Sequence, residues 1–382
     1  MKKLTSLSIL GMMLTAASLQ AQVDIKITGS TAFRGSMFRA ITNLYGANLQ
    51  NENPGGPTAN NSGANRVTYR GTIPGLFGSS IVTVYTDMGG SIQGVHSLVL
   101  NDLQTFFSNP TNSATGPAGA TNLFTGVADL AFSDVYQNST VYQSTALRDL
   151  FVAVQPFALV KGVSAASLSI SNITSQQLKT FLGNGAVTLS YFTGKTNDDA
   201  NTVYLPGRSE DSGTRLTIDL DSGFGPSGFE NFVYDVTPGG TWFLSTNTVP
   251  GFSSGSGVAT ALKNVNTTNA AIGYLGINDS LGVNAGANVI TYNGALPFKG
   301  IFSSSTGTTN DYTPVIEGTY SYWSYEHLFE RASVSTSSDL HKYRTALAAN
   351  IDLDIATIFP KIAVRLSEMK VSRQADGGPI AP

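Results

Sequence analysis

The sequence has no cysteine among its 382 residues. Disulfide bonds, thiolate metal sites and a cysteine nucleophile are therefore excluded. Charged residues are also scarce, at 12% of the chain, about half of the usual ~25%. Beyond the N-terminus, no apolar run approaches the ~20 residues that a membrane-spanning helix needs. We therefore expect a polar but weakly charged surface, and no membrane span in the mature form.

Residues 1–21 have the three-part layout of a secretory signal peptide. Lys2 and Lys3 form a basic start, residues 4–17 are mostly apolar, and Ala21 is a plausible cleavage point. Cleavage there leaves 20 basic and 25 acidic residues, an acidic balance that disfavours nucleic-acid binding. Because no cysteine is available for a lipid anchor, we expect the mature protein to be free in the periplasm or secreted.

Short Gly/Ser/Thr turns recur directly after predicted strands. Residues 23–28 alternate apolar and polar residues as a strand does, and apolar residues at helical spacing follow from Met37. Ser30 or Thr31, in the turn between them, is the expected N-cap of that helix. Such a turn offers hydroxyl and backbone N–H donors to an anion, or it only caps the helix.

Two further segments have a similar form. A predicted strand at 81–85 leads through Asp87 to Ser91, and apolar residues at helical spacing follow over 95–107. The apolar run 126–132 is typical of a buried parallel strand, and Asp134 lies just after it. A carboxylate at the C-terminal end of such a strand lies where α/β sheets bind ligands, although Asp134 is equally placed to cap a following helix.

The segment from Arg208 to Thr214 is the densest cluster of anion-binding residue types. It holds Arg208, two hydroxyls at Ser212 and Thr214, and Gly213. Arginine and hydroxyl groups donate to oxyanions, and glycine allows close backbone approach. If a helix starts here, its first N–H groups face the same ligand. The alternation of apolar residues over 216–220 instead favours a strand, so the sequence leaves the two alternatives open.

The remaining pattern predicts further elements in both halves of the chain. Residues 151–160 form a long apolar run around Pro156, which we expect to pass from one domain to the other. Further predictions are a helix at 172–183, a strand at 203–205, a helix at 257–265, a strand at 271–275, a hairpin within 284–313, a return to the first domain at 320–325, and C-terminal helices over 340–366 that Pro360 interrupts.

In this order, the segments resemble those of the phosphate-binding proteins of bacterial ABC uptake systems, which are periplasmic two-lobed receptors. Residues 27–33 look like the family's first phosphate loop, 85–91 like its second loop, and 129–134 like the segment whose final aspartate accepts the phosphate proton. Arg208 with Ser212, Gly213 and Thr214 matches the family's Arg and Ser-Gly-Thr spacing and is the most specific part. The resemblance covers most of the mature chain, with Asn/Gly-rich insertions.

The resemblance implies an α/β fold of two lobes, each a mixed sheet flanked by helices, with a ligand cleft between them. Lobe 1 would comprise 22–156 plus 317–382, and lobe 2 would comprise 157–316. The implied ligand-binding residues come from both lobes: Ser30, Thr31, Phe33, Ser91, Asp134, Arg208, Ser212, Gly213 and Thr214. The implied function is capture of phosphate, or a similar protonated tetrahedral oxyanion, by a monomer that delivers it to an ABC permease.

Asp134 carries a chemical argument of its own within this hypothesis. A buried carboxylate beside an oxyanion is repulsive unless a proton lies between them. Hydrogen phosphate carries such a proton at neutral pH and sulfate does not, so the carboxylate favours phosphate over sulfate.

Two other functions are consistent with parts of the sequence. An enzyme would use Ser212 as a nucleophile, or Asp87, Asp134 and Asp211 as metal ligands. No Gly-x-Ser-x-Gly segment surrounds Ser212, and no pair of histidines has metal-ligand spacing, so we expect no catalysis, no cofactor and no metal. The third hypothesis is a secreted or surface interaction protein that keeps the two-lobed scaffold without a transport role.

Overall fold

The protein is described here from a computed structural model. It describes residues 22–53, 64–108, 122–225, 233–237, 240–245, 251–265, 268–300, 310–357 and 361–382. The predicted signal peptide, much of the two long loops around residues 55 and 115, part of the predicted hairpin and Pro360 lie outside the described residues.

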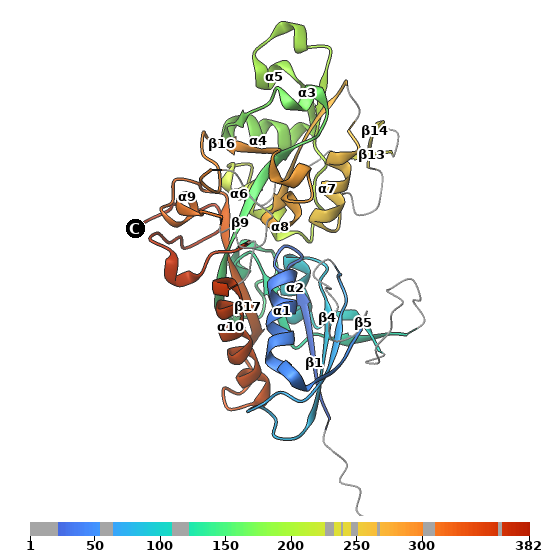
Figure 1. Ribbon diagram of the computed structural model, residues 1–382, viewed down its shortest axis with the longest axis vertical. Coiled ribbons are helices and arrows are strands. Elements are labelled where there is room, and N and C mark those ends of the chain that lie inside the picture. The colour runs from blue at the N-terminus through green and yellow to red at the C-terminus, as the bar shows by residue number, and fades with distance from the viewer. Residues whose placement is uncertain are drawn as a thin grey trace, which may run out of the picture.

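The chain folds into two lobes, one above the other in Figure 1. Within the described residues, lobe 1 carries the long helices α1 (Arg34–Tyr45), α2 (Ser91–Leu100) and α10 (Asp339–Thr357). The helices of lobe 2 are α3 (Ala165–Leu168), α4 (Ser175–Asn184), α5 (Ser190–Thr193), α6 (Gly213–Asp221), α7 (Gly255–Lys263), α8 (Ile277–Ser280) and α9 (Thr313–Ile316). Short 3₁₀ turns lie at Gly46–Asn48, Gln137–Ser139, Thr196–Asp198, Asn284–Gly286 and Leu366–Glu368.

The sheet of lobe 1 places the predicted turns at one edge. Its order is β2 (Leu49–Asn53), β3 (Thr68–Gly71), β4 (Ile81–Asp87), β1 (Gln22–Gly29), β7 (Leu130–Ser133) and β17 (Trp323–Arg331). Strands β1, β4 and β7 are parallel. Their carboxyl ends therefore meet, and the segments holding Ser30, Ser91 and Asp134 follow those ends directly. The hairpin of β5 (Leu103–Phe107) and β6 (Leu123–Val127) pairs separately.

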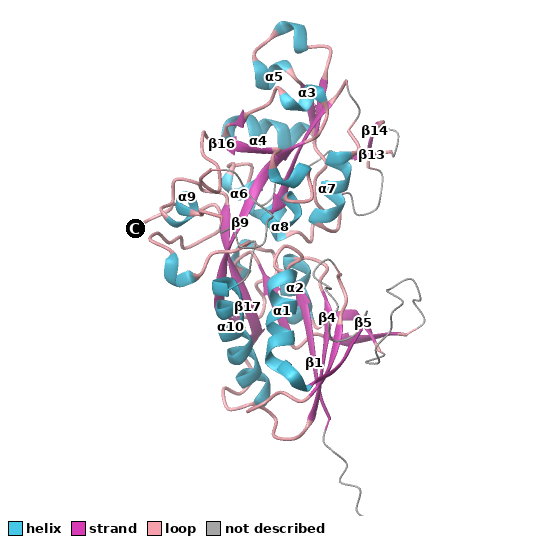
Figure 2. Cartoon of the chain, in the orientation of Figure 1, coloured by secondary structure: helices cyan, strands magenta, loops and turns pink. Residues whose placement is uncertain are grey.

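Strand β9 (Phe151–Lys161) joins the two lobes into one sheet. Its first half pairs with β17, and its second half pairs with β15 (Ala270–Gly276) and β16 (Val289–Tyr292). The sheet continues in lobe 2 through β12 (Thr202–Tyr204) and β11 (Ala186–Thr188). The magenta strands of Figure 2 show this passage between the lobes. Smaller pairings involve β8 (Leu147–Arg148), β10 (Asn172–Ile173), β13 (Tyr234–Val236) and β14 (Trp242–Leu244).

Each lobe has its own hydrophobic core. One cluster of buried side chains packs α1 and α10 against the lobe 1 sheet, and the small cluster around Val95 and Ala131 packs α2 on the opposite face. A larger cluster fills lobe 2 and extends to Trp323 and Val364. The protein is therefore a mixed α/β fold of two lobes whose sheet is flanked by helices, which confirms the predicted fold class. The residue limits predicted for the lobes stay a prediction.

The C-terminal segment 361–382 contacts β17 of lobe 1 and α6 of lobe 2, where Arg373 Nη1 lies 3.9 Å from Asp221 Oδ1. The guanidinium of Arg373 donates to the backbone oxygens of Trp323 and Ser321, at 3.0 and 2.6 Å, and lies 4.1 Å over the Trp323 ring. Asp376 accepts from the backbone N–H of Tyr136, at 2.9 Å. No helix among the described ranges is long and apolar enough to cross a membrane.

Several local predictions are wrong in detail. The sequence predicts a helix over 95–107, but α2 ends at Leu100. Asn101 then adopts a left-handed conformation (φ 60°), and the chain continues as β5. The predicted strand 126–132 is interrupted by a turn at Asp129, whose carboxylate accepts from the N–H of Lys26 at 2.8 Å. Asp134 caps no α-helix, because only the 3₁₀ turn that begins at Gln137 follows it.

Candidate functional site

The segment after Arg208 forms a helix, and the predicted strand there is wrong. Ser212 is the N-cap of α6, and its hydroxyl accepts from the N–H of Arg215 at 3.3 Å. Seven of the nine residues of α6 are buried. Because the helix is enclosed on nearly all sides, its apolar residues are not confined to one face, and their spacing does not show the 3.6-residue period of a helix. The first N–H groups of α6 thus lie at Gly213 and Thr214.

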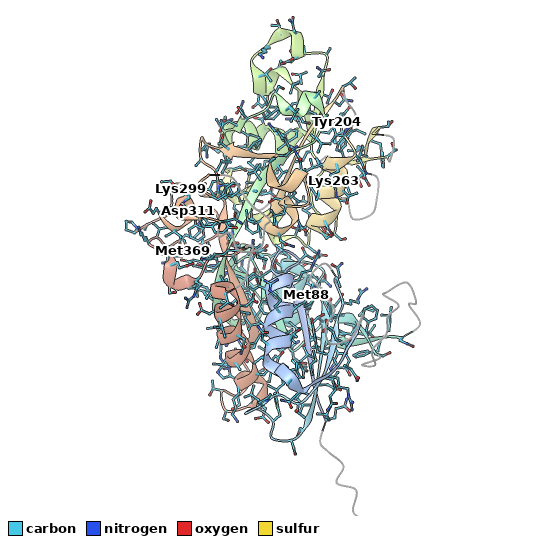
Figure 3. All side chains as sticks on the ribbon, viewed as in Figure 1. Met88, Tyr204, Lys263, Lys299, Asp311 and Met369 are labelled. Carbon is cyan, nitrogen blue, oxygen red and sulfur yellow. The ribbon has the colours of Figure 1, made fainter. Side chains whose placement is uncertain are left out.

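The N-terminus of α2 lies directly across the lobe boundary from the start of α6. The backbone N–H of Ile92 donates to the carbonyl oxygen of Asp211, at 3.0 Å. Gly90 has φ +152°, and a Cβ there would lie 2.3 Å from the same oxygen. Only glycine adopts this backbone angle readily and has no Cβ to collide with the oxygen. The predicted second loop therefore brings Ser91, which is buried, to the lobe 2 segment. Figure 3 labels Met88, just before this loop, near the boundary.

Asp134 projects from the end of β7 to the start of α6. Its side chain is fully buried. The Thr214 hydroxyl donates to Oδ2 at 3.3 Å, whereas Oδ1 has no hydrogen-bond partner among the described residues. Burial raises the pKa of Asp134 to about 6, against the opposing effects of the Ser91 hydroxyl and the Arg208 charge. Both the protonated and the ionised form of this carboxyl group are therefore populated near neutral pH.

Arg208 reaches the same boundary from lobe 2 and is equally buried. Its Nε donates to the Phe252 carbonyl at 3.0 Å, and its Nη2 donates to the Ser253 carbonyl at 3.2 Å and to the Thr31 hydroxyl of lobe 1 at 3.0 Å. The phenol of Tyr274 accepts from its backbone N–H at 2.8 Å. Burial lowers the pKa of Arg208, and the nearby carboxylates of Asp279 and Asp134 counteract this. These hydrogen bonds fix the position of the guanidinium, and its charge acts on Asp134.

The first loop differs from the prediction at its cap. Helix α1 begins at Arg34, with Phe33 at the N-cap position and no side-chain cap, so neither Ser30 nor Thr31 is the N-cap. The Ser30 hydroxyl instead accepts from the Phe33 N–H at 3.4 Å, and the Thr31 hydroxyl accepts from Arg208. The Phe33 ring packs in the core against Phe132, with centroids 6.0 Å apart, so only its backbone faces this loop.

Asp87, which enters the second loop, is turned away from Ser91. Its carboxylate forms an ion pair with Arg66, with Nε and Oδ1 2.9 Å apart, and accepts from the N–H of Thr105 at 3.2 Å. Its charge is therefore balanced inside lobe 1.

Four charged or phenolic residues at the boundary could not be recognised as site residues from the sequence. Arg34 and Asp279 lie near Arg208, Tyr322 donates to the Thr214 carbonyl at 3.0 Å, and Glu326 lies near Asp134. Arg34 directly follows the first loop, so its position could have drawn attention. The others lie far along the chain, and only the fold brings them to the boundary.

The residues suggested for catalysis are engaged in other contacts. The Ser212 hydroxyl caps α6. Asp211 lies beside His96, with Oδ1 3.7 Å from Nε2, while His96 Nδ1 lies 2.7 Å from Asp102. Across the described ranges, no group of three His, Asp or Glu side chains is arranged to hold a metal ion.

A pocket of ≈ 500 Å³ opens beside the same boundary, between residues 138–143 and the start of α6. Its charged lining is mostly acidic and includes Glu210, Asp211 and Asp219, with Arg215 as the basic member. This lining is unfavourable for an anion, so the candidate anion site is the buried cluster around Asp134 and Arg208 and not this pocket.

Taken together, these contacts define a two-lobed α/β protein with a buried polar site where two helix N-termini, an arginine and a carboxyl group converge from both lobes. The structure brings Ser30, Thr31, Ser91, Asp134, Arg208, Ser212, Gly213 and Thr214 to this boundary.

No protein-family model and no curated protein matches the chain. Among solved structures, the chain is similar to a putative phosphate ABC transporter substrate-binding protein with bound phosphate from Clostridium perfringens, at 13% identity and a TM-score of 0.49, covering 90% of this chain and 99% of that one. It is also similar to an ABC-type phosphate transport receptor from Vibrio cholerae, at 18% identity and a TM-score of 0.46, covering 88% and 100%. A mutant OxyR from Corynebacterium glutamicum matches at 8% identity and a TM-score of 0.39, covering 90% of this chain and 69% of that one. All three TM-scores lie below 0.5.

Proposed function

We propose that this protein binds hydrogen phosphate, or a similar protonated tetrahedral oxyanion, between its two lobes. The observation that carries the proposal is the meeting of Asp134, from lobe 1, with the N-terminus of α6, from lobe 2. A Cβ added at Gly213 would lie 1.7 Å from Asp134 Oδ1 and 2.7 Å from the Ser91 Cβ. The backbone of α6 therefore approaches both side chains as closely as glycine allows.

The donors around this point suit an anion with several oxygen atoms. Helices α2 and α6 each direct the positive end of the helix dipole to the boundary, and the first N–H groups of α6, at Gly213 and Thr214, lie there. The hydroxyls of Ser91 and Ser212 add donors, the Thr214 hydroxyl can exchange its bond to Asp134 for one to the anion, and Arg208 adds a full positive charge. Each charge-assisted hydrogen bond contributes ~1.5–3 kcal/mol. Several such contacts, less the cost of closing the lobes, are consistent with micromolar or tighter binding.

Asp134 determines which anion the site accepts. Its unpartnered Oδ1 is an acceptor in a site otherwise made of donors. An anion that carries a proton can donate it to Oδ1, whereas sulfate offers only lone pairs and is repelled by the buried charge. The proposal therefore includes selectivity for phosphate over sulfate.

Binding requires the lobes to separate and close again. Thr31 and Arg208, Ile92 and Asp211, and Asp134 and Thr214 are already in contact, so the described state is closed. Strands β9 and β17 connect the lobes and are the expected hinge.

Isothermal titration of the protein after residue 21 with sodium phosphate and with sodium sulfate tests this function. We expect one phosphate per chain and at least tenfold weaker binding of sulfate. Absence of binding would refute the function, and equal affinities would refute the role of Asp134.

We further propose that a monomer delivers the anion to an ABC permease after export to the periplasm. Growth on limiting phosphate of cells with and without the protein, together with a permease, tests this step. If uptake does not depend on the protein although it binds phosphate, the scaffold serves in binding without transport.

A further inference from the structure

Glu326 is a second buried acid beside Asp134. It lies on β17, its side chain is fully buried, and neither carboxylate oxygen has a hydrogen-bond partner among the described residues. A buried carboxyl group without partners is costly, because its desolvation is not compensated. At the lobe boundary, this cost is reduced if the carboxyl group keeps a proton or contacts a bound ligand.

The strand register explains why the two acids meet. Strands β17 and β7 are antiparallel, and His327 pairs with Ser133. One step further along this ladder, Glu326 lies opposite Asp134. Side chains opposite each other on neighbouring strands point to the same face, with Cβ atoms ~4.5–5.5 Å apart. The pairing of β17 with β9 also shifts its register between Glu326 and His327, an irregularity that re-aims side chains beside functional sites.

We propose that Glu326 is a second ligand-binding acid of the interlobe site: in the free protein it and Asp134 together retain one proton, and with the anion bound Glu326 donates its O–H to the anion while Asp134 accepts the proton of the anion. This inference rests on the proposed function and adds one donor to it. The proton stays between oxygen atoms throughout, so no other reactant is needed.

The surrounding charges agree with a shared proton. Burial, together with the Asp134 charge, raises the pKa of Glu326 well above its ordinary value, and the nearby Ser30 hydroxyl opposes this rise. Arg208 and Tyr322 face Asp134 from the boundary, and Asp376 faces it from the C-terminal segment, where it raises the pKa of Asp134. Arg208 is the cation that acts on Asp134, and no cation among the described residues acts on Glu326, so protonation of one of these two acids is favoured.

The experiment compares phosphate affinity from about pH 6 to pH 9 in the wild type, Glu326→Gln, Glu326→Ala and the exposed control Glu317→Gln. Glutamine stays neutral and keeps one donor. The ionisation of phosphate itself is common to all four proteins, so ratios of their dissociation constants isolate the effect of the glutamate.

Relative to Glu326→Gln, we expect wild-type affinity to fall with rising pH, approaching tenfold per pH unit once Glu326 ionises. We expect Glu326→Ala to bind about tenfold more weakly than Glu326→Gln at pH 6. A pH-independent ratio, or equal affinities of the two variants, would overturn the assignment.

The unfolding free energy of the anion-free proteins provides a readout that does not depend on phosphate. A raised pKa in the folded state means that stability is lost as pH rises through that value. Wild-type stability should therefore fall relative to Glu326→Gln as pH rises, and Glu317→Gln should not reproduce the difference. Parallel profiles would refute the shared proton. If the wild type binds no phosphate, the proposed function and the ligand contact fail together, while the stability profiles still decide whether the two acids share a proton.

Discussion

Asp134 and Gly213 meet across the lobe boundary so closely that a Cβ on the glycine would lie 1.7 Å from Oδ1 of the aspartate. Asp134 follows β7 of lobe 1, and Gly213 opens α6 of lobe 2. The contact therefore requires closed lobes, and the absence of a side chain at position 213 is what permits it.

Gly213→Ala tests this contact. The added methyl group cannot be accommodated by a flexible side chain, because both neighbours are held in the buried site. We expect phosphate affinity to fall about 100-fold or more, equivalent to ~3 kcal/mol of lost N–H and closure contacts. Gly183→Ala in α4 is the matched control, because its Cβ would meet only Phe224 at 3.4 Å. Unchanged affinity in Gly213→Ala, measured by titration calorimetry, would contradict the closed site.

Asp134→Asn tests the role of the carboxyl group in stability and in selectivity. The folded-state pKa of about 6 lies above the ordinary value of 3.8, so the folded protein holds a proton that the unfolded chain releases. Its stabilising contribution is complete below about pH 4 and is lost as pH rises through 6. Because asparagine does not ionise, we expect Asp134→Asn to gain about 2–3 kcal/mol relative to wild type between pH 4 and pH 7.

Urea unfolding at several pH values measures that difference, and sulfate titration measures selectivity in the same variant. Without the buried charge, the preference for phosphate over sulfate should narrow. Identical pH profiles of the two proteins would show that Asp134 does not keep a raised pKa.

The sequence predicted the parts of this site that depend on local order. Strand, turn and helix followed each other as expected around Ser91, and Arg208 lies near Ser212 along the chain. It did not decide between helix and strand at α6, because burial on nearly all sides removes the amphipathic period. Glu326 could not be predicted for a different reason. Only the pairing of β17 with β7 places it beside Asp134, and the local sequence does not determine which distant strands pair or in what register.

Arg208→Lys tests the need for a planar fork. A lysine keeps the charge but cannot contact Phe252, Ser253 and Thr31 together as the guanidinium does. We expect weaker binding of every anion, by tenfold or more, and a still greater loss in Arg208→Ala. Lys342→Ala, an exposed residue of α10, serves as the control for a general loss of positive charge. Full binding by Arg208→Ala would exclude the arginine from the site.

His96→Gln tests a pH-dependent contact between the lobes. Burial lowers the pKa of His96, but the carboxylates of Asp211 and Asp102 outweigh this effect and raise it overall. A raised histidine pKa gives stability that is complete below about pH 6.5 and is lost as pH rises through the folded-state value. We expect the thermal midpoint of the wild type to fall over this window relative to His96→Gln. Parallel curves would show that the charged histidine does not join the lobes.

Arg373→Ala tests how far the C-terminal segment supports both lobes. The substitution removes two backbone hydrogen bonds and the contact over the Trp323 ring, and it leaves the buried Asp221, 3.9 Å from Nη1, without this cation. We expect a loss of about 3–5 kcal/mol of unfolding free energy. Lys370→Ala, which breaks an exposed ion pair with Glu317, should lose less than about 1 kcal/mol. Comparable losses would show that Arg373 is not a structural link.

A crystal structure of the protein after residue 21, grown with phosphate, tests the central claim most directly. The account predicts one tetrahedral anion between the lobes, in contact with the carboxyl group of Asp134, the guanidinium of Arg208 and the first N–H groups of α6. An anion bound to one lobe alone, or at a place that touches neither Asp134 nor Arg208, would contradict it.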